Sequence, residues 1–288
     1  MQNNLPNFFV VGSPKCGTTS VYHYLSKHQD IFLPSKKELN FFSSEEIIRQ
    51  NLYYDSFMVD DFNHYKDLYK NSHNFCAKGD FSVSYLFYKD VPKKIKDCVP
   101  DAKIIIFLRN PLDRSYSHYL MDFRLGYINN SIEQIIKNPK KFNTYYQQII
   151  ELSMYFNQVK RYKDLFGDNV KIILFEQLKN DTASTINSIL DFINVDKNVD
   201  LITDIKHNSF KMPKNNLVKK IYNNKKIRTF FSKLTPKIFK KAIFSIFFTY
   251  DKPKLTVSTK NYLSNLFHDD IKSLEKLINE DLSDWYKY

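Results

Sequence analysis

The sequence predicts an α/β fold, a single domain in which helices flank a parallel β-sheet. Three short apolar runs, at residues 8–11, 102–108 and 170–175, have the length and composition of buried strands. Segments with the apolar spacing of helices separate these runs. Continuous apolar strands that alternate with helices are typical of a parallel sheet that is covered on both faces.

The individual elements follow from the same patterns. The first strand ends at Gly12, and helical spacing covers residues 18–28 after a short loop. Residues 75–81 are a weaker strand candidate. The strand at 102–108 precedes Pro111, which opens a helix at the position where proline is favoured. Further helices are predicted over 111–125, 143–166, 182–193 and 258–282.

The length of the chain limits the number of domains, and the distribution of charge along it indicates where an anionic partner could bind. With 288 residues the chain has room for one large domain, which we expect to span residues 1–288. The formal net charge of +12 is concentrated in residues 206–254, which hold 14 Lys and Arg and one acid, and 29 basic and 30 acidic residues lie elsewhere. We expect this basic segment to be helical. It indicates an anionic partner, or it is a solvated lysine-rich face.

The cysteines and the apolar runs indicate a compartment. Cys16, Cys76 and Cys98 have no C-x-x-C spacing and fit neither a disulfide framework nor a zinc site. Residues 1–7 carry no Lys or Arg, and no apolar run approaches the ~18 residues that a membrane span needs. The default expectation is therefore a cytoplasmic protein.

The loop after the first strand carries the strongest chemical signal. Residues 12–19 read G-S-P-K-C-G-T-T between a strand and a helix, a setting in which backbone N–H groups and a helix N-terminus hold a phosphate. The pattern is close to the nucleotide-binding P-loop. However, Thr18 occupies the usual lysine position, and the lysine, Lys15, lies inside the loop. This departure argues against a P-loop kinase, which needs its lysine on the terminal phosphates.

The same loop resembles the 5′-phosphosulfate loop of sulfotransferases that use 3′-phosphoadenosine 5′-phosphosulfate (PAPS). The resemblance implies transfer of a sulfonate group, with 3′-phosphoadenosine 5′-phosphate (PAP) as the product and Lys15 on the leaving phosphate oxygen. The other loop residues that it assigns to the nucleotide are Cys16, Gly17, Thr18, Thr19 and Ser20. We expect no metal, because Lys15 and the loop N–H groups can stabilise the leaving phosphate.

A second motif follows the strand at 102–108. Residues 109–117 read R-N-P-L-D-R-S-Y-S and resemble the family's 3′-phosphate element, an Arg at a strand end with a Ser eight residues later. An Arg fork and a hydroxyl together suit a dianion. Arg109 and Ser117 are therefore predicted to bind the 3′-phosphate, with His118 beside it.

Two further positions are assigned to the nucleotide by resemblance. Phe175 opens F-E-Q-L, which is similar to the family's Y-E-D-L turn, where the aromatic residue lies near the adenine. A buried core Phe is the alternative. Asn208, in the H-N-S sequence at 207–209, resembles a loop that closes over the nucleotide in bacterial relatives.

The candidate for the general base comes from residues 36–42. They read K-K-E-L-N-F-F and resemble the K-E-P-H-F-F segment of the carbohydrate sulfotransferases, in which the glutamate is the base. This resemblance assigns the role to Glu38, because a neutral hydroxyl needs a proton acceptor to become a good nucleophile. Asn40 stands where that family has His. Asp80 is the alternative carboxylate, and carbohydrate members often carry Lys at the position of Phe81.

The sequence therefore predicts sulfonate transfer from PAPS to a hydroxyl or amine of a saccharide or small natural-product acceptor. The alternatives are a P-loop kinase-like enzyme and a nucleic-acid or membrane-binding module that uses the basic segment, where aromatic residues interleave with lysines. We expect no nucleic acid as a partner and leave weak contact with an anionic membrane surface open. The identity of the acceptor and the oligomeric state are not predicted.

Overall fold

A five-stranded parallel β-sheet forms the centre of the computed structural model, which describes residues 5–54, 56–197, 212–214, 218, 223 and 247–287. The strands lie in the order β2-β3-β1-β4-β5. They are β1 (Phe8–Gly12), β2 (Ile31–Phe32), β3 (Ala77–Phe81), β4 (Lys103–Leu108) and β5 (Val170–Leu174). The predicted α/β fold with a parallel sheet and flanking helices is confirmed, and the weak strand candidate is β3.

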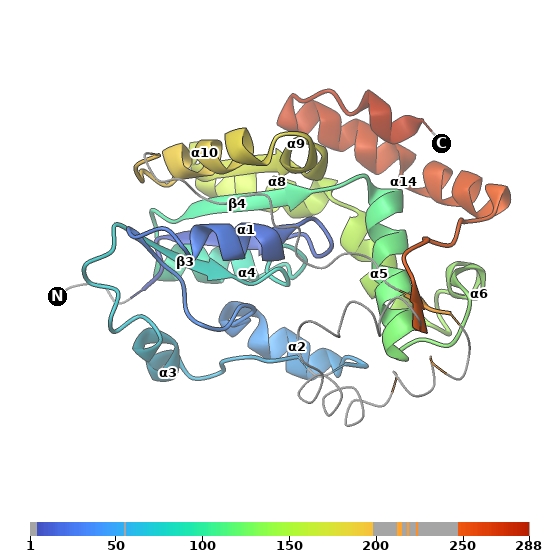
Figure 1. Cartoon of the computed structure of the whole chain (residues 1–288), viewed down its shortest axis with the longest axis horizontal. Coiled ribbons are helices and arrows are strands. Elements are labelled where there is room, and N and C mark those ends of the chain that lie inside the picture. The colour runs from blue at the N-terminus through green and yellow to red at the C-terminus, as the bar shows by residue number, and fades with distance from the viewer. Residues whose placement is uncertain are drawn as a thin grey trace.

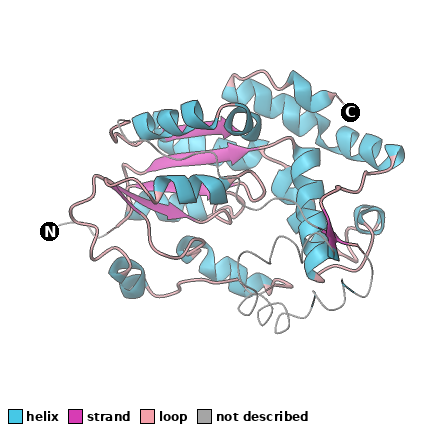
Figure 2. Ribbon diagram, in the orientation of Figure 1, coloured by secondary structure: helices cyan, strands magenta, loops and turns pink. Residues whose placement is uncertain are grey.

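Helices cover both faces of this sheet (Figure 1). In chain order the longer ones are α1 (Thr18–Leu25), α2 (Ser44–Gln50), α3 (Phe62–Asp67), α4 (Val91–Cys98), α5 (Pro111–Leu125), α6 (Ile132–Lys137), α7 (Asn143–Ile149), α8 (Phe156–Phe166), α9 (Phe175–Asn180), α10 (Thr182–Phe192) and α14 (Val257–Ile278). Short 3-10 turns lie at Phe41–Ser43, Glu151–Ser153, Gly167–Asn169 and Ser283–Tyr286. Figure 2 shows the alternation of strands and helices that the sequence pattern predicts.

The hydrophobic core lies on both sides of the central strands. Alternate residues of a strand point to opposite faces, so Phe8 and Val10 pack with α1 and α10, whereas Phe9 and Val11 pack with α4, α5, α8 and α14. All four side chains are fully buried. Each such side chain contributes about 1.5–3 kcal/mol through the hydrophobic effect, which explains why the strand pattern is a continuous apolar run.

One predicted helix, 143–166, is wrong, because the chain breaks it into α7, a 3-10 turn and α8. The Arg114 guanidinium donates to the carbonyl oxygens of Gln148 and Ile149, which a continuous helix would use for its own hydrogen bonds. The Asp270 carboxylate accepts from the N–H groups of Tyr155 and Phe156 and so caps the start of α8. Both partners come from distant segments, which a local pattern cannot reveal.

The parallel arrangement gathers three connections at one edge of the sheet. α1 begins after β1, α5 after β4 and α9 after β5, and the carboxyl ends of these parallel strands meet at the same edge. The phosphate loop, Arg109 and Phe175 lie in these three connections. The fold therefore gathers motifs that are more than 150 residues apart in the sequence.

Most of the basic segment lies outside the described residues. Two short strands, β6 (Met212–Pro213) and β7 (Phe248–Thr249), pair antiparallel within it. The predicted helical character of the segment and the predicted nucleotide contact of Asn208 fall on residues that the structure does not describe. No helix among the described residues is long and apolar enough to span a membrane.

Candidate active site

The phosphate loop has the backbone that its sequence predicts. Gly17 is the N-cap of α1 with a φ of 85°, a left-handed conformation that glycine adopts without steric cost. Because glycine has no side chain to cap the helix, the N–H groups of Thr18 and Thr19 are left for a ligand, whereas that of Ser20 donates to the Gly17 carbonyl oxygen. Thr18 is buried in that first turn, and Thr19 and Ser20 follow it half-buried. Cys16 is fully buried, which raises the pKa of its thiol to about 11, so it packs as a neutral thiol.

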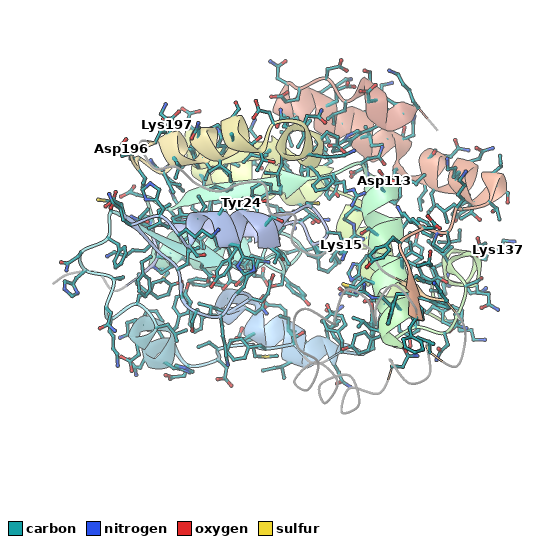
Figure 3. The ribbon with its side chains drawn as sticks, in the orientation of Figure 1. Lys15, Tyr24, Asp113, Lys137, Asp196 and Lys197 are labelled. Carbon is teal, nitrogen blue, oxygen red and sulfur yellow. The ribbon has the colours of Figure 1, made fainter. Side chains whose placement is uncertain are left out.

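Lys15 lies in the loop, next to α5 (Figure 3). Its Nζ is 3.3 Å from the Met121 sulfur. Burial, and then the positive charge of Arg124, lowers the pKa of Lys15 to about 8. A cation that is held in an electropositive, partly dehydrated place gains more than usual from the arrival of an anion. Lys15 is therefore poised to bind a negatively charged group.

Arg109 lies directly against this loop. Its Nη1 donates to the Lys15 carbonyl oxygen at 3.3 Å, and its guanidinium stacks over the Phe175 ring at 4.7 Å. Its Nε is buried and has no hydrogen-bond partner among the described residues. A buried N–H group without a hydrogen-bond partner destabilises the protein. An anionic ligand that accepts a hydrogen bond from this atom would remove that cost.

Ser117 lies on the face of α5 that carries Asp113 and Met121. These residues are four apart and therefore share one side of the helix. Asp113 pairs with Arg109 at 3.6 Å, and Met121 contacts Lys15, so this side of α5 faces the loop. The structure brings the two phosphate motifs together as the sequence predicts.

Phe175 is half-buried at the start of α9 rather than in the centre of the core. Its ring lies against Arg109 and close to Gly17, where an added Cβ would approach the ring to 3.2 Å. The ring therefore connects the phosphate loop to the arginine.

A partly open cavity of about 410 Å³ lies beside the loop. Pro14 of the loop, Glu38 of the following segment and Met121 of α5 belong to its wall. The remaining lining residues are Lys37, Asn40, Ile47, Leu52, Tyr54, Ser56, Phe57, Val83, Ser84, Phe87, Tyr88, His118, Asp122, Tyr127, Gln148 and Leu152. A volume of this size fits a small molecule or one sugar ring.

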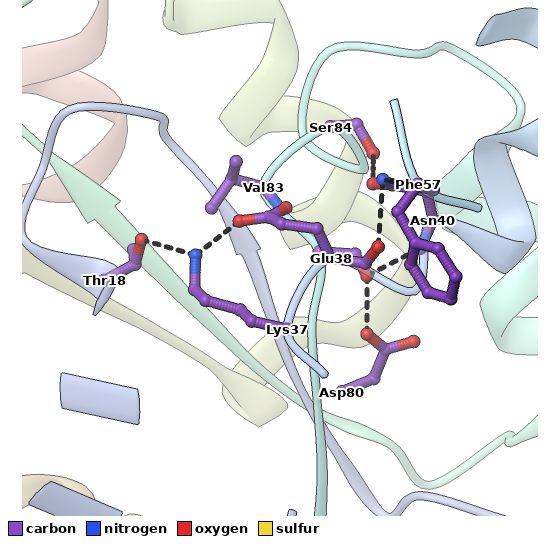
Figure 4. A network of polar contacts seen from close by, with 9 residues as sticks. Thr18, Lys37, Glu38, Asn40, Phe57, Asp80, Val83 and Ser84 are labelled. Atoms are coloured by element: carbon purple, nitrogen blue, oxygen red, sulfur yellow. Dashed lines mark hydrogen bonds and ion pairs between the residues drawn. The ribbon is translucent and has the colours of Figure 1, made fainter. Parts of the chain in front are cut away.

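Glu38 faces the cavity and is held on both carboxylate oxygens (Figure 4). The Val83 N–H donates to Oε2 at 2.9 Å, and the Lys37 ammonium bonds to Oε1. Lys37 also donates to the Thr18 hydroxyl at 3.2 Å, and its side chain is 15% exposed. Lys37 thus links the carboxylate to the first turn of α1. Sequence reasoning missed it, although it lies next to Glu38 in the motif.

Asn40 fixes the backbone around Glu38. Its side chain donates to the carbonyl oxygens of Glu38 and Phe57 at 3.1 and 2.8 Å, and it accepts from the Ser84 hydroxyl at 2.6 Å. Both Glu38 and Asn40 have positive φ values, 62° and 53°, which these hydrogen bonds compensate. Asn40 therefore acts as a support for the loop.

Asp80 has a different environment from Glu38. It is fully buried and does not line the cavity. The hydroxyls of Tyr65 and Tyr85 donate to Oδ2, and the Ser82 hydroxyl donates to Oδ1. Burial raises the pKa of Asp80 to about 6. A carboxylate with both oxygens occupied and no access to the cavity holds the structure together.

His118 lines the cavity, and its place beside the 3′-phosphate stays a prediction. It is one residue beyond Ser117, so its side chain is rotated by about 100° around the helix axis. There it contacts Arg114 and lies near Asp122. Asp122 and the aromatic wall were not foreseen, because no local pattern in α5 distinguishes them from ordinary core positions.

The two predicted phosphate-binding motifs lie at the ends of parallel strands, next to a cavity that contains a carboxylate, an arrangement that suits group transfer from a nucleotide. A family profile described as the sulfotransferase domain matches residues 5–277. The chain belongs to the sulfotransferase domain family. This membership replaces the kinase-like alternative.

Individual relatives agree with the family. The mouse protein named bifunctional heparan sulfate N-deacetylase/N-sulfotransferase 4 is 27% identical over 205 residues, which are 67% of this chain and 23% of that protein. The human protein named bifunctional heparan sulfate N-deacetylase/N-sulfotransferase 3 is 28% identical over 205 residues, which are 67% of this chain and 23% of that protein. The chain thus spans about a quarter of the length of these curated relatives. A sulfotransferase crystal structure from Alicyclobacillus acidocaldarius is 29% identical, with a TM-score of 0.71, over 98% of this chain and 99% of that one.

Proposed function

We propose that this protein transfers a sulfonate group from PAPS to a hydroxyl or amine of a saccharide or a small natural product. The observation that carries the proposal is the meeting of three features at one sheet edge: Lys15 inside a phosphate loop, Arg109 stacked against that loop, and Glu38 in the adjoining cavity. A donor at the loop and an acceptor in the cavity would meet between Lys15 and Glu38.

The phosphate loop is proposed to bind the 5′-phosphosulfate. The uncapped N–H groups at the start of α1 and the hydroxyls of Thr18, Thr19 and Ser20 suit phosphate oxygens, and Cys16 and Gly17 contribute backbone. Lys15 would stabilise the charge that develops on the departing phosphate oxygen. The lowered pKa of Lys15 supports this role, because its ammonium gains most when a negative charge arrives.

Arg109 and Ser117 are proposed to bind the 3′-phosphate, and Phe175 to lie next to the adenine. The unpartnered Nε of Arg109 supports the first assignment, and the position of the Phe175 ring between the arginine and Gly17 supports the second. The contact of Asn208 with the nucleotide remains a prediction from the sequence.

Glu38 is proposed as the general base and Lys37 as its positioning residue. The acceptor oxygen or nitrogen attacks sulfur, the bond between sulfur and the phosphate oxygen breaks, and the acceptor proton passes to the Glu38 carboxylate. The products are PAP and a sulfate ester or sulfamate. Cavity access favours Glu38 over Asp80, and the contacts of Lys37 with the Glu38 carboxylate and the Thr18 hydroxyl support its positioning role.

We also propose a reducing, cytoplasmic location. Cys16, Cys76 and Cys98 are all free thiols, and Cys76 is exposed. Exposed thiols of this kind persist in reducing compartments.

Calorimetry of nucleotide binding tests the donor proposal. Arg109→Ala should weaken the binding of PAP by about 30- to 150-fold, the value of a lost charge-assisted contact of ~2–3 kcal/mol. The binding of adenosine 5′-monophosphate, which lacks the 3′-phosphate, should change little. Equal losses for both nucleotides would contradict the 3′-phosphate assignment, and a wild-type protein that binds neither nucleotide would contradict the function.

A further inference from the structure

A second carboxylate lines the same cavity as Glu38. Asp122, on α5, is 1% exposed and belongs to the cavity wall. Its Oδ2 accepts a hydrogen bond of 2.6 Å from the Tyr53 hydroxyl. Its Oδ1 is buried and has no hydrogen-bond partner among the described residues. An unpartnered carboxylate oxygen in a cavity wall is costly in the free protein, so a ligand group that donates a hydrogen bond there has much to gain.

The neighbours of Asp122 hold this oxygen in a fixed position. Arg114 is fully buried and is anchored on the Ser153 hydroxyl and two backbone carbonyls. Its Nη1 lies 3.1 Å from His118 Nδ1. A guanidinium can only donate, so Nδ1 accepts, and the ring hydrogen is on Nε2, 3.5 Å from Asp122 Oδ2. Burial and the charge of Arg114 lower the pKa of His118 well below its usual value, so a neutral His118 and Tyr53 both face Oδ2 and leave Oδ1 free.

The charges of the cavity wall indicate the kind of acceptor. Among the described lining residues the charged ones are Lys37, Glu38 and Asp122. Lys37 and Glu38 pair with each other, so Asp122 is the negative charge in this wall without a countercharge in contact. Lys15 lies near enough to lower the pKa of Asp122, although burial has the larger effect and raises it to about 6. Asp122 is therefore ionised at neutral pH.

We propose that Asp122 Oδ1 binds a second hydroxyl or an ammonium group of the acceptor, apart from the group that receives the sulfonate. The acceptor is then an uncharged or cationic molecule with at least two hydrogen-bond donors, such as a neutral sugar or an amino sugar, and a carboxylated or already sulfated ring is disfavoured in the cavity. This inference rests on the proposed function. Asp122 is a specificity residue, and Glu38 remains the base.

A matched set of acceptors tests the inference with the full-length protein and radiolabelled PAPS. Glucose, glucosamine and glucuronate differ in charge but share a ring size. For the wild-type protein we expect kcat/KM for glucuronate to be at least tenfold below that for the other two. Asp122→Asn presents an amide N–H₂ or a weaker acceptor to the ligand, and it should raise KM for glucosamine by about 10- to 100-fold, as the loss of a charge-assisted hydrogen bond does. KM for glucuronate should stay equal or fall.

Two further variants distinguish a loss of acceptor recognition from a general loss of folding or activity. Asp164→Asn removes an exposed carboxylate on α8 that pairs with Lys160, neither of which lines the cavity, and it should leave the order of the three acceptors unchanged. Asp122→Glu keeps the charge on a longer side chain, and it should keep the discrimination against glucuronate while KM rises. The affinity for PAP should not fall in Asp122→Asn, because a negative charge near Lys15 has been removed.

The outcomes distinguish this inference from the proposed function. A wild-type protein that prefers glucuronate, or that binds PAP but sulfonates none of the three acceptors, overturns the acceptor class and leaves the donor site intact. The same conclusion follows if folded Asp122→Asn and Asp122→Glu both retain wild-type KM values and selectivity. A wild-type protein that fails to bind PAP instead removes the proposed function.

Discussion

At the scale of single residues, the site depends on charges that are placed before any ligand arrives. Burial lowers the pKa of Lys15, and so do the positive charges of three arginines, Arg109, Arg114 and Arg124. The negative charge of Asp122 partly opposes this shift. The nearby arginines keep the free site electropositive. An anionic donor replaces this repulsion with attraction, which raises the pKa of Lys15 in the complex.

The pH dependence of donor binding follows from this shift. The bound state holds the Lys15 proton more tightly than the free state, so PAP binding should be strongest below pH 8 and should weaken as the pH rises from about 8 towards 9.5. Lys15→Met should bind PAP at least tenfold more weakly at pH 7 and show no slope over this range. Calorimetry at five pH values measures both. A slope that persists in Lys15→Met would assign the titration to another group.

Substitutions of the two candidate carboxylates, Glu38 and Asp80, should differ in their effects on catalysis. Glu38→Gln keeps the shape of the side chain but removes the proton acceptor, so kcat should fall by ~100- to 10,000-fold while PAP affinity is nearly unchanged. Asp80→Asn keeps a side chain that can accept from both tyrosines, so its main effect should be on the free energy of unfolding. Steady-state kinetics and thermal melts of both variants provide the comparison. An active Glu38→Gln beside an inactive, folded Asp80→Asn would make Asp80 the base.

At the scale of elements, the turn from β1 into α1 determines whether the loop can accept a phosphate. Gly17 combines a left-handed backbone with close packing against α9. A Cβ at this position would meet the Leu178 side chain at 2.8 Å and the Phe175 ring at 3.2 Å. Helix α1, the loop and Phe175 can therefore approach one another only because position 17 lacks a side chain.

Gly17→Ala and Gly167→Ala are a matched pair for this argument. Both glycines have positive φ, 85° and 53°, so both substitutions introduce backbone strain, and the strain is larger at Gly167, whose ψ of −122° lies outside the left-handed helical region. A Cβ at Gly167 meets nothing within 4 Å. We expect Gly17→Ala to weaken PAP binding by about tenfold or more because Phe175 and Leu178 must move, whereas Gly167→Ala should bind PAP normally. Calorimetry beside thermal melts measures the pair, and equal PAP affinities would show that the close packing at Gly17 is unimportant.

At the scale of the whole molecule, the excess positive charge is concentrated in one segment of the chain. Residues 206–254 contain 14 of the 43 basic residues and one acid, and the rest of the chain is nearly neutral. The described cavity wall, in contrast, has two carboxylates and one lysine. The prediction that the whole chain, residues 1–288, is one domain also belongs to this scale and remains a prediction.

The concentration of charge in the basic segment predicts an effect of salt on binding. Replacing Lys219, Lys220, Lys225 and Lys226 with Gln should reduce binding to vesicles that contain phosphatidylserine, or to an anionic acceptor, and should flatten its dependence on salt. Sedimentation of vesicles at several salt concentrations measures the first effect, and initial rates measure the second. If neither changes, the lysines form a solvated face without a partner.

The sequence by itself predicted four strands of the parallel sheet, several of its helices, the loop that contains Lys15, and the strand-end Arg109. These features are local: a buried parallel strand must be apolar, and a phosphate loop must join a strand to a helix, so both leave a pattern within about ten residues. A short motif in the sequence also indicated Glu38 as the general base. The sequence did not show that Glu38 and Asp80 have different environments.

Only the tertiary structure decided the break between α7 and α8, the pairing of Lys37 with Glu38 and Thr18, and the presence of Asp122 in the cavity wall. Each depends on residues that are far apart in the chain, such as Arg114 with Gln148 or Asp122 with Tyr53. Burial separates Asp80 from Glu38 in the same way, because two of the three hydroxyls around Asp80 come from the segment that follows β3 and the third comes from α3. A local sequence pattern carries the propensity of a segment, whereas exposure, partner and charge environment are set by what packs against it.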